Sequence, residues 1–516
     1  MESINAKPKV KSTLFFTFVL SLVFNCFFTE KEFGISFPIF ILLCIFVFLW
    51  NGGNSIIKNT KSIGWVLILP ILLLAFTVPI YSNMILLPFN ILFVLFLMVS
   101  SSILICNENI PWEKFEFIKR VLYQSIYYTF KNLFLPVKYI FKFLAVKDGY
   151  RLSSKLKNIL IGICISVPLI VILLNLLISA DMVFGYYLTK SVSWIAYIEF
   201  NIIFFRGLII LCVFLYLSSY FISFSGSRVL EHQFAKPKAN STVCTLESPE
   251  GDESISNNSE NKPVSFSLPK ETMITILVLI DVIYLTFTII QFSYLYGGAT
   301  GALPTNFTYS EYARRGFFEL IFVTLINLSI LLLFISYRNL LDKISKNIIN
   351  SLLSLTLIFT LVMLFSSNYK LTLYESSYGY TNLRIFVHMF LITLLILFVI
   401  ILIGIWRDSF PLTKVLIISL LSIYVVVNYV NVEKIVAIEN IKRFEQTAKI
   451  DFDYLSSLSY DALPAIIKLT ENSNVDIANA TKEYLQRKKF ILSHENKSWY
   501  EFNYSKYRAR KLLSDF

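Results

Sequence analysis

Long apolar runs recur along most of this 516-residue chain and limit the folds open to it. A helix needs about twenty apolar residues to cross the roughly 30 Å hydrocarbon core of a bilayer, where irregular backbone would leave polar groups unsatisfied. The runs in this chain approach that length. We therefore expect an all-α, polytopic bundle of about eleven transmembrane helices, at residues 13–28, 34–50, 62–80, 83–106, 157–180, 194–222, 273–296, 316–336, 347–368, 384–406 and 411–430.

The composition agrees with a membrane protein, because 56% of the residues are hydrophobic and only 16% are charged. The formal net charge of +12 does not indicate nucleic-acid binding. In a membrane protein such an excess of Lys and Arg places cations beside anionic lipid headgroups. We therefore expect membrane lipids, and no nucleic acid, as partners.

The distribution of Lys and Arg predicts the orientation, because positive charge is retained on the cytoplasmic side. The gaps assigned to the cytoplasm, starting with the N-terminus, hold several times as many of these residues as the opposite gaps. The bias toward Ile, Phe, Tyr, Lys and Asn is typical of an AT-rich bacterial genome. We expect a bacterial plasma membrane protein with a cytoplasmic N-terminus and an extracytoplasmic C-terminus.

Changes in polarity divide the chain into four parts. Residues 1–222 form a six-span half, in which residues 111–146 have the pattern of an amphipathic helix at the membrane surface. That helix is either a linker packed on the bundle or a lipid-binding element. Residues 223–270 are polar and predict a disordered cytoplasmic loop. Residues 271–430 form a five-span half, and residues 431–516 predict a small helical extracytoplasmic tail.

Ionisable residues inside spans are costly and are therefore candidates for function. Arg206 and Asp281 lie at matching depths in the sixth and seventh spans, and Glu199 lies seven residues before Arg206. Three interpretations remain open for Arg206 and Asp281. They form a structural ion pair, they move ions or protons, or they do not meet.

A second candidate cluster lies where the chain enters the eighth span from the outer side. Two arginines there run against the charge bias, so nearby carboxylates should neutralise them. The cluster either receives an anionic headgroup or an extracytoplasmic ligand, or it only locks the start of this helix. Its residues are Tyr309, Glu311, Tyr312, Arg314, Arg315, Glu319 and, two turns deeper, Asn327.

Residues for catalysis, metal binding or cofactor binding are scarce. The six cysteines form no C-x-x-C pair, and the three histidines, His232, His388 and His494, are predicted in different compartments. We therefore predict no metal site, no cofactor and no catalytic residue, and favour a protein that is not an enzyme.

Two segments resemble a family of uncharacterised bacterial multi-pass membrane proteins. They are YSEYARRGFFELIFVTLIN, from Tyr309, and KIDFDYLSSLSYDALPAI, at 449–466. The closing Trp499, Asn503, Tyr507, Arg508 and Arg510 are also similar to the C-terminal region of that family. The resemblance implies a domain of unknown function and brings no substrate or cofactor.

The sequence leaves three classes of function open. A membrane assembly or signalling component, with the outer loop and tail as a platform for protein partners, explains the tail best. A transporter or channel for an ion or small solute would use the ionisable residues in the spans. A membrane-embedded lipid-modifying enzyme comes third, because no nucleophile and base are visible.

Overall fold

The computed structural model describes residues 10–57, 62–106, 110–146, 200–225, 269–295, 317–338, 341–495 and 498–515. Within these ranges all regular structure is helical, so the predicted all-α class is confirmed. Nine of the described helices are long and apolar enough to cross a membrane, and the apolar stretch Ser36–Asn51 is slightly shorter. The predicted span at 157–180 lies outside the described residues.

The chain divides into two compact units that exchange short segments. Unit 1 comprises residues 1–79, 88–238 and 497–503, and unit 2 comprises residues 80–87, 239–496 and 504–516. Each unit therefore contains a short piece from the other half of the sequence.

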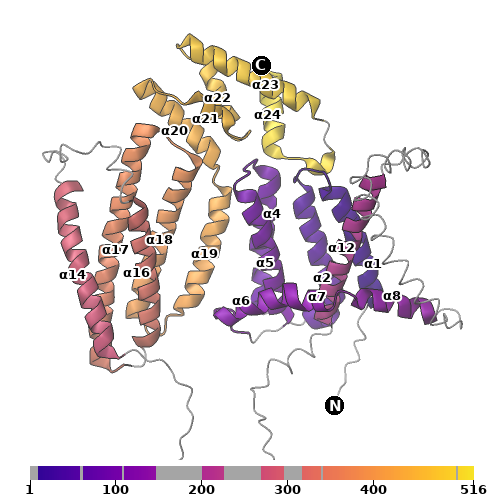
Figure 1. The fold of residues 1–516 in the computed structure, drawn as a ribbon, viewed down its shortest axis with the longest axis horizontal. Coiled ribbons are helices and arrows are strands. Elements are labelled where there is room, and N and C mark those ends of the chain that lie inside the picture. The colour runs from indigo at the N-terminus through magenta and orange to yellow at the C-terminus, as the bar shows by residue number, and fades with distance from the viewer. Residues whose placement is uncertain are drawn as a thin grey trace, which may run out of the picture. The chain divides into compact units, whose positions relative to one another are not determined.

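Unit 1 is built from long apolar helices and a row of shorter ones (Figure 1). The long helices are tied by hydroxyl and amide groups, as is common where lipid provides no hydrophobic drive for helix association. Thr17 and Ser218 lie 2.6 Å apart, and Asn51 donates to the carbonyl of Phe221 at 2.9 Å. Its helices are α1 (Val10–Phe28), α2 (Ser36–Ile57), α3 (Ile63–Val66), α4 (Ile68–Ile80), α5 (Leu86–Cys106), α6 (Phe115–Leu122), the π-helical turn η1 (Tyr123–Tyr128), α7 (Thr129–Lys131), α8 (Leu135–Val146), α12 (Phe200–Ser225) and η5 (Trp499–Glu501).

The row from α6 to α8 falls within the stretch predicted as amphipathic. Phe117 and Val121 are buried, while Phe115, Ile126 and Phe130 are exposed. Figure 1 shows α6, α7 and α8 crossing the ends of the long helices of unit 1. Apolar side chains that are exposed on such a surface helix suit the headgroup region of a bilayer.

Unit 2 surrounds one long helix, α17, which packs against α14, α16 and α18. α17 has 36 residues and is about 54 Å long at 1.5 Å per residue, far more than a bilayer core requires. It therefore extends beyond both ends of the predicted span at 347–368. The membrane helices of unit 2 are α14 (Lys270–Leu295), α16 (Phe317–Tyr337), α17 (Lys343–Tyr378), α18 (Asn382–Trp406) and α19 (Leu412–Tyr429).

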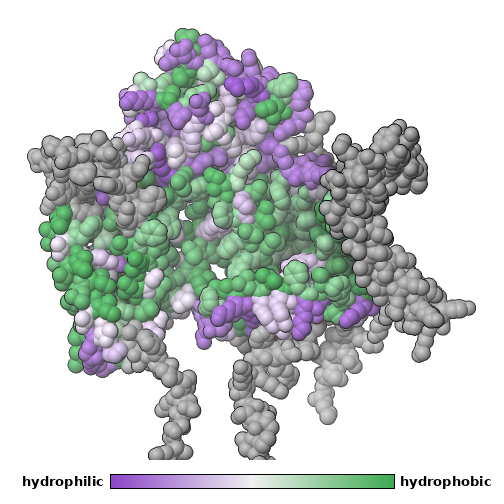
Figure 2. Space-filling model, viewed as in Figure 1, coloured by the Kyte–Doolittle hydropathy of each residue, from purple (hydrophilic) through white to green (hydrophobic). Residues whose placement is uncertain are grey.

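The remaining helices of unit 2 form a tail domain, defined here as residues 432–495 and 504–515. Its core gathers Leu455, Leu463, Ile466 and Leu485, and partly buried residues of α18 such as Phe386 pack against it. Figure 2 shows mainly hydrophobic surface along the long helices and more hydrophilic surface on the tail domain. The helices are α20 (Val432–Thr447), α21 (Phe452–Ser457), α22 (Leu463–Ile466), the 3-10 helix η4 (Ile467–Glu471), α23 (Val475–His494) and α24 (Tyr504–Ser514).

The tail domain is fixed to the turn between α17 and α18. Arg443 donates to the carbonyls of Ser376 and Ser377, which end α17, at 2.9 and 2.7 Å. Gly379 has a φ of 84°, and a Cβ there would lie 2.7 Å from Oδ1 of Asn440. Glycine is needed at this helix end both for its dihedral angle and for the approach of α20.

Candidate functional site

A buried hydrogen-bond network joins α14, α16 and α17 inside the apolar part of unit 2. The hydroxyl of Thr356 donates to Oδ1 of Asp281 at 2.7 Å. Asn327 donates to Thr360 at 2.8 Å and accepts from the Tyr284 hydroxyl at 2.5 Å. Thr360 in turn donates to the backbone carbonyl of Thr356 at 2.7 Å. Three helices are thus connected through one polar chain that ends at a carboxylate.

Asp281 is only 5% exposed, and only half of its carboxylate is satisfied. The second oxygen, Oδ2, is buried and has no hydrogen-bond partner among the described residues. Nearly all buried polar atoms in proteins find a partner, so an unpaired carboxylate oxygen calls for a specific explanation. A bound proton or a small cation would supply one.

A second buried carboxylate lies near the C-terminal end of α17. Glu375 is 1% exposed, its Oε2 lies 2.8 Å from Nε2 of His388 on α18, and its Oε1 has no partner among the described residues. Nδ1 of His388 lies 2.8 Å from Oδ1 of Asn368. His388 on α18 therefore bridges two side chains of α17, Glu375 and Asn368.

Buried polar residues continue along α17 between these two carboxylates. Thr356 and Glu375 are about 28 Å apart along the helix axis at 1.5 Å per residue. The polar residues of α17 that are less than 9% exposed are Ser345, Asn350, Thr356, Thr360, Ser366, Ser367, Lys370 and Glu375. One helix therefore carries polar groups from the Asp281 network to the Glu375–His388 pair.

Near the N-terminal end of α17, the buried Arg338 connects α17 to the end of α18. Arg338 donates to Oδ1 of Asn350 at 2.5 Å, to the carbonyl of Gly404 at 2.8 Å, and to the carbonyl of Ile405. These carbonyls belong to the last turn of α18, where a cation also interacts favourably with the helix dipole. Lys346 and Asp408 form an ion pair beside it at 2.8 Å. The Nε of Arg338 has no partner among the described residues, but its other contacts tie α17 and α18 together, which suits a structural role.

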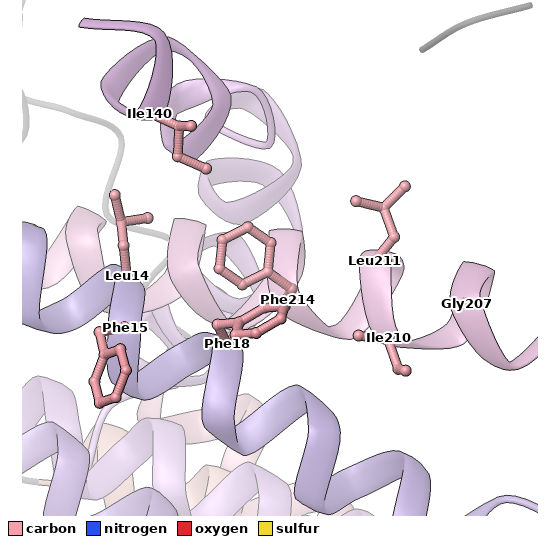
Figure 3. A pocket seen from close by; sticks show the side chains of 8 residues that line it. All are labelled: Leu14, Phe15, Phe18, Ile140, Gly207, Ile210, Leu211 and Phe214. Atoms are coloured by element: carbon pink, nitrogen blue, oxygen red, sulfur yellow. The ribbon is translucent and has the colours of Figure 1, made fainter. Parts of the chain in front are cut away.

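In unit 1 the ionisable residue of the sixth span has a different environment. Arg206 pairs with Glu30 at 2.6 Å, and both side chains are substantially exposed. The helix that carries Arg206 also borders a cavity of about 540 Å³ between α1, α8 and α12. Figure 3 shows the residues that line it, and none has a polar side chain: Leu14, Phe15, Phe18, Ile140, Gly207, Ile210, Leu211 and Phe214. This cavity offers no polar path.

The predicted site residues are therefore only partly described. Asn327 and Asp281 belong to one network, although the sequence placed them in separate clusters. Arg206 and Asp281 have the partners given above within their own units, and a pair between them stays a prediction. Glu199, Tyr309, Glu311, Tyr312, Arg314 and Arg315 lie outside the described residues, as does the side chain of Glu319.

Sequence reasoning missed Glu375, Lys370 and the threonines of α17. The predicted span ends at residue 368, seven residues before Glu375. A helical signal was nevertheless present, because Thr356, Thr360 and Ser367 recur at spacings of four and seven residues. His388 was noted only as an isolated histidine, although it lies beside a carboxylate. Within the described ranges, no group of three or more His, Cys, Asp and Glu is placed to hold a metal ion.

Comparison with known proteins identifies a family for this chain. The model of a family described as "Domain of unknown function (DUF4153)" matches residues 68–469, which is well over half of the chain. No curated protein and no solved structure matches. The match begins in the first half, earlier than the resemblance in the sequence suggested.

Proposed function

The chain belongs to the DUF4153 family, whose domain has no known function, and we propose from the geometry that unit 2 is a proton-handling transport component. In this proposal Asp281 is the proton-binding group within the membrane. The Glu375–His388 pair is a second such group near the outer end of α17. This is the transport alternative that the sequence left open.

The observation that carries the proposal is the pair of half-satisfied carboxylates. Asp281 and Glu375 are each at least 95% buried, and each has one oxygen without a partner among the described residues. An ionised carboxylate in a membrane bundle is expensive unless it is fully paired. A proton that binds to the unpaired oxygen neutralises the carboxylate and so removes this cost.

Another buried polar group of the same bundle, Asn327, differs from these carboxylates. The Asn327 amide uses both its oxygen and its nitrogen, in hydrogen bonds to Tyr284 and Thr360. Contacts of this kind serve to hold helices together. Asp281 and Glu375 differ from Asn327 because each has one carboxylate oxygen without a partner among the described residues, which a purely structural role does not require.

Proton flux into liposomes tests the proposal. We would reconstitute the full chain with a pH-sensitive dye inside the vesicles and impose a membrane potential with potassium and valinomycin. We expect wild-type flux above that of protein-free vesicles, and Asp281→Asn should reduce it to background. Glu375→Gln should also lower it, because each amide is close in size to the carboxyl but cannot carry a proton.

The matched control is Glu445→Gln, which makes the same chemical change at an exposed position of α20. Its flux should equal that of wild type. The proposal fails if wild-type vesicles are no more permeable to protons than empty ones in the presence and absence of a potential. It also fails if Asp281→Asn conducts as well as Glu445→Gln.

One observation favours a second candidate, an assembly or signalling component. The tail domain is fixed to the ends of the membrane helices, as described for Arg443, and presents exposed apolar residues that include Val475, Phe490 and Ile491. Phe490 and Ile491 are adjacent, exposed and apolar, which makes this part of α23 a candidate contact for a protein partner. Crosslinking from a photoreactive residue at position 490, in living cells, would give a discrete adduct under this reading. The absence of any adduct would count against it.

We also propose that the tail lies outside a bacterial plasma membrane, with the N-terminus in the cytoplasm. The bias of Lys and Arg supports this orientation. Contacts within the units are compatible with it, because tail residues bind turns that the charge bias assigns to the outer side. In unit 1 the amide of Ile35 donates to the carbonyl of Phe502 at 3.0 Å, and in unit 2 the amide of Ser82 donates to Asp461 at 2.7 Å.

A further inference from the structure

A cluster of cations and tyrosines on the tail domain is not used by the proposed transport function. It lies where α23 and α24 approach the turn that precedes α22. All of its members belong to unit 2: Tyr460, Tyr484, Lys488, Glu495, Lys506 and Arg510.

Lys488 is the central member of this cluster. Its ammonium lies 5.1 Å from the ring centre of Tyr460 and 5.5 Å from that of Tyr484. The side chain is half-buried, and its ammonium has no hydrogen bond or ion pair with any described residue. An ammonium has three N–H donors, so all three are left for an acceptor from outside the chain.

Further positive charge lies close by. Lys506 is 5.6 Å from the ring centre of Tyr460, so one ring has an ammonium from each helix beside it. Glu495 lies 3.5 Å from Lys506 and 3.6 Å from Arg510. The cluster as defined has three cations and one carboxylate, and this carboxylate pairs with Lys506 and Arg510 and not with Lys488.

We infer that this cluster binds a phosphate or phosphodiester group through the ammonium of Lys488, with Lys506 and Arg510 supplying additional positive charge. Lysine binds phosphate as a compact point charge, and the tyrosine rings hold the long side chain in place. A phosphate or phosphodiester group also offers more acceptor oxygens than a carboxylate. The group could belong to a soluble anion or to a lipid headgroup.

Binding should depend on pH in a defined direction. Burial, and secondly the charge of Lys506, lower the pKa of Lys488 from its ordinary value. A bound anion favours the charged ammonium, so binding and protonation reinforce each other. Affinity should therefore fall as the pH rises through the pKa of Lys488.

The test observes Lys488 directly in the full chain. The protein would be purified in a maltoside detergent, which contains no phosphate, and its lysines labelled by ¹³C reductive methylation, which preserves their charge. Inorganic phosphate would be titrated at constant ionic strength, and a parallel titration would use short-chain phosphatidylglycerol. The Lys488 signal is identified by its loss in Lys488→Arg.

We expect a saturable shift of the Lys488 signal. In Lys488→Gln the affinity, followed by thermal shift, should be at least about tenfold weaker, as for loss of one charge-assisted hydrogen bond. Lys488→Arg should retain most of it. The matched control is Lys489→Gln, which removes one exposed charge from the next position of α23.

Each outcome is decisive. A response to inorganic phosphate supports the site and assigns it to a soluble anion, whereas a response to phosphatidylglycerol alone supports it as a headgroup site. If neither ligand moves the Lys488 signal, the inference is overturned. The same holds if Lys489→Gln weakens binding as much as Lys488→Gln, because the effect would then be general charge screening.

Discussion

Asp461 joins two distant segments of unit 2 through its two carboxylate oxygens. Oδ2 accepts from the amide of Ser82 at 2.7 Å, and Oδ1 accepts from the side chain of Asn431 at 3.4 Å. Burial raises the pKa of Asp461 above its ordinary value of 3.8, and burial likewise raises the pKa of the nearby Glu433. The folded tail domain therefore holds protons on these groups more tightly than the unfolded chain does.

This shift predicts how stability depends on pH. The folded-state pKa of Asp461 is raised above the unfolded-state pKa of 3.8. Asp461 therefore contributes most to the free energy of unfolding at a pH below 3.8, and this contribution is lost as the pH rises through the folded-state pKa. In Asp461→Asn the loss of stability that Asp461 causes as the pH rises should disappear, because an amide does not titrate. Melting temperatures in detergent, measured from pH 4 upward, check this. A parallel decline in wild type and variant would contradict it.

Arg338 gives a second prediction at the scale of single residues. Arg338→Met removes three hydrogen bonds and leaves buried acceptors on α17 and α18 unpaired, which costs about 1–3 kcal/mol for each such acceptor. We expect the free energy of unfolding to fall by about 2 kcal/mol or more, seen as a lower melting temperature in detergent.

The comparison for Arg338 is Arg407→Met, in the exposed turn after α18. This variant should melt close to wild type, because surface substitutions rarely change stability by more than about 0.5 kcal/mol. Equal melting temperatures for Arg338→Met and Arg407→Met would show that Arg338 does not hold the helix ends together.

Among the elements, the turn between α1 and α2 lies directly against the backbone of the segment 498–503. A Cβ on Gly34 would lie 2.5 Å from the backbone carbon of Glu501. Glu501 also accepts from the amide of Glu32 at 3.1 Å, and Phe27 packs on Tyr500 with ring centres 5.4 Å apart. The segment 498–503 is therefore seated on this turn within unit 1.

Gly34→Ala should displace that segment. Backbone cannot yield as a flexible side chain can, so the Ile35–Phe502 hydrogen bond should weaken. Faster hydrogen exchange at the Ile35 amide would report this. Gly207→Ala is the control, because a Cβ there meets nothing within 4 Å, and alanine in a helix is favoured over glycine by up to about 1 kcal/mol. Unchanged exchange in Gly34→Ala would contradict the prediction.

The elements also show what a sequence can and cannot predict. Most spans were predictable because hydropathy is a local property. The full length of α17 was not, since Lys370 and Glu375 are compatible with a membrane helix only when α18 and neighbouring elements cover them. In the site, Asp281 and Asn327 were identifiable as polar residues within apolar runs. Their partners were not, because pairing between helices depends on rotation and depth, which hydropathy does not encode.

At the scale of the whole molecule, the proposed orientation can be tested by labelling. Single cysteines at Ser493, in the tail domain, and at Ser409, in the turn after α18, would be introduced into a background without native cysteines. A membrane-impermeant maleimide should label the first in intact cells and the second only after permeabilisation. Both side chains are exposed, so access is not limited by burial. The reverse labelling pattern would show that the protein has the opposite orientation.

Because the units exchange segments, a gene divided between them would encode two incomplete units. A break between residues 226 and 268 separates most of unit 1 from most of unit 2, but the N-terminal product keeps residues 80–87 and lacks the segment seated on Gly34. The C-terminal product then lacks Ser82, the backbone partner of Asp461. The N-terminal product therefore lacks residues 497–503 of unit 1, and the C-terminal product lacks residues 80–87 of unit 2. The two should be recovered together when they are expressed together, and a tag on either one should retain the other.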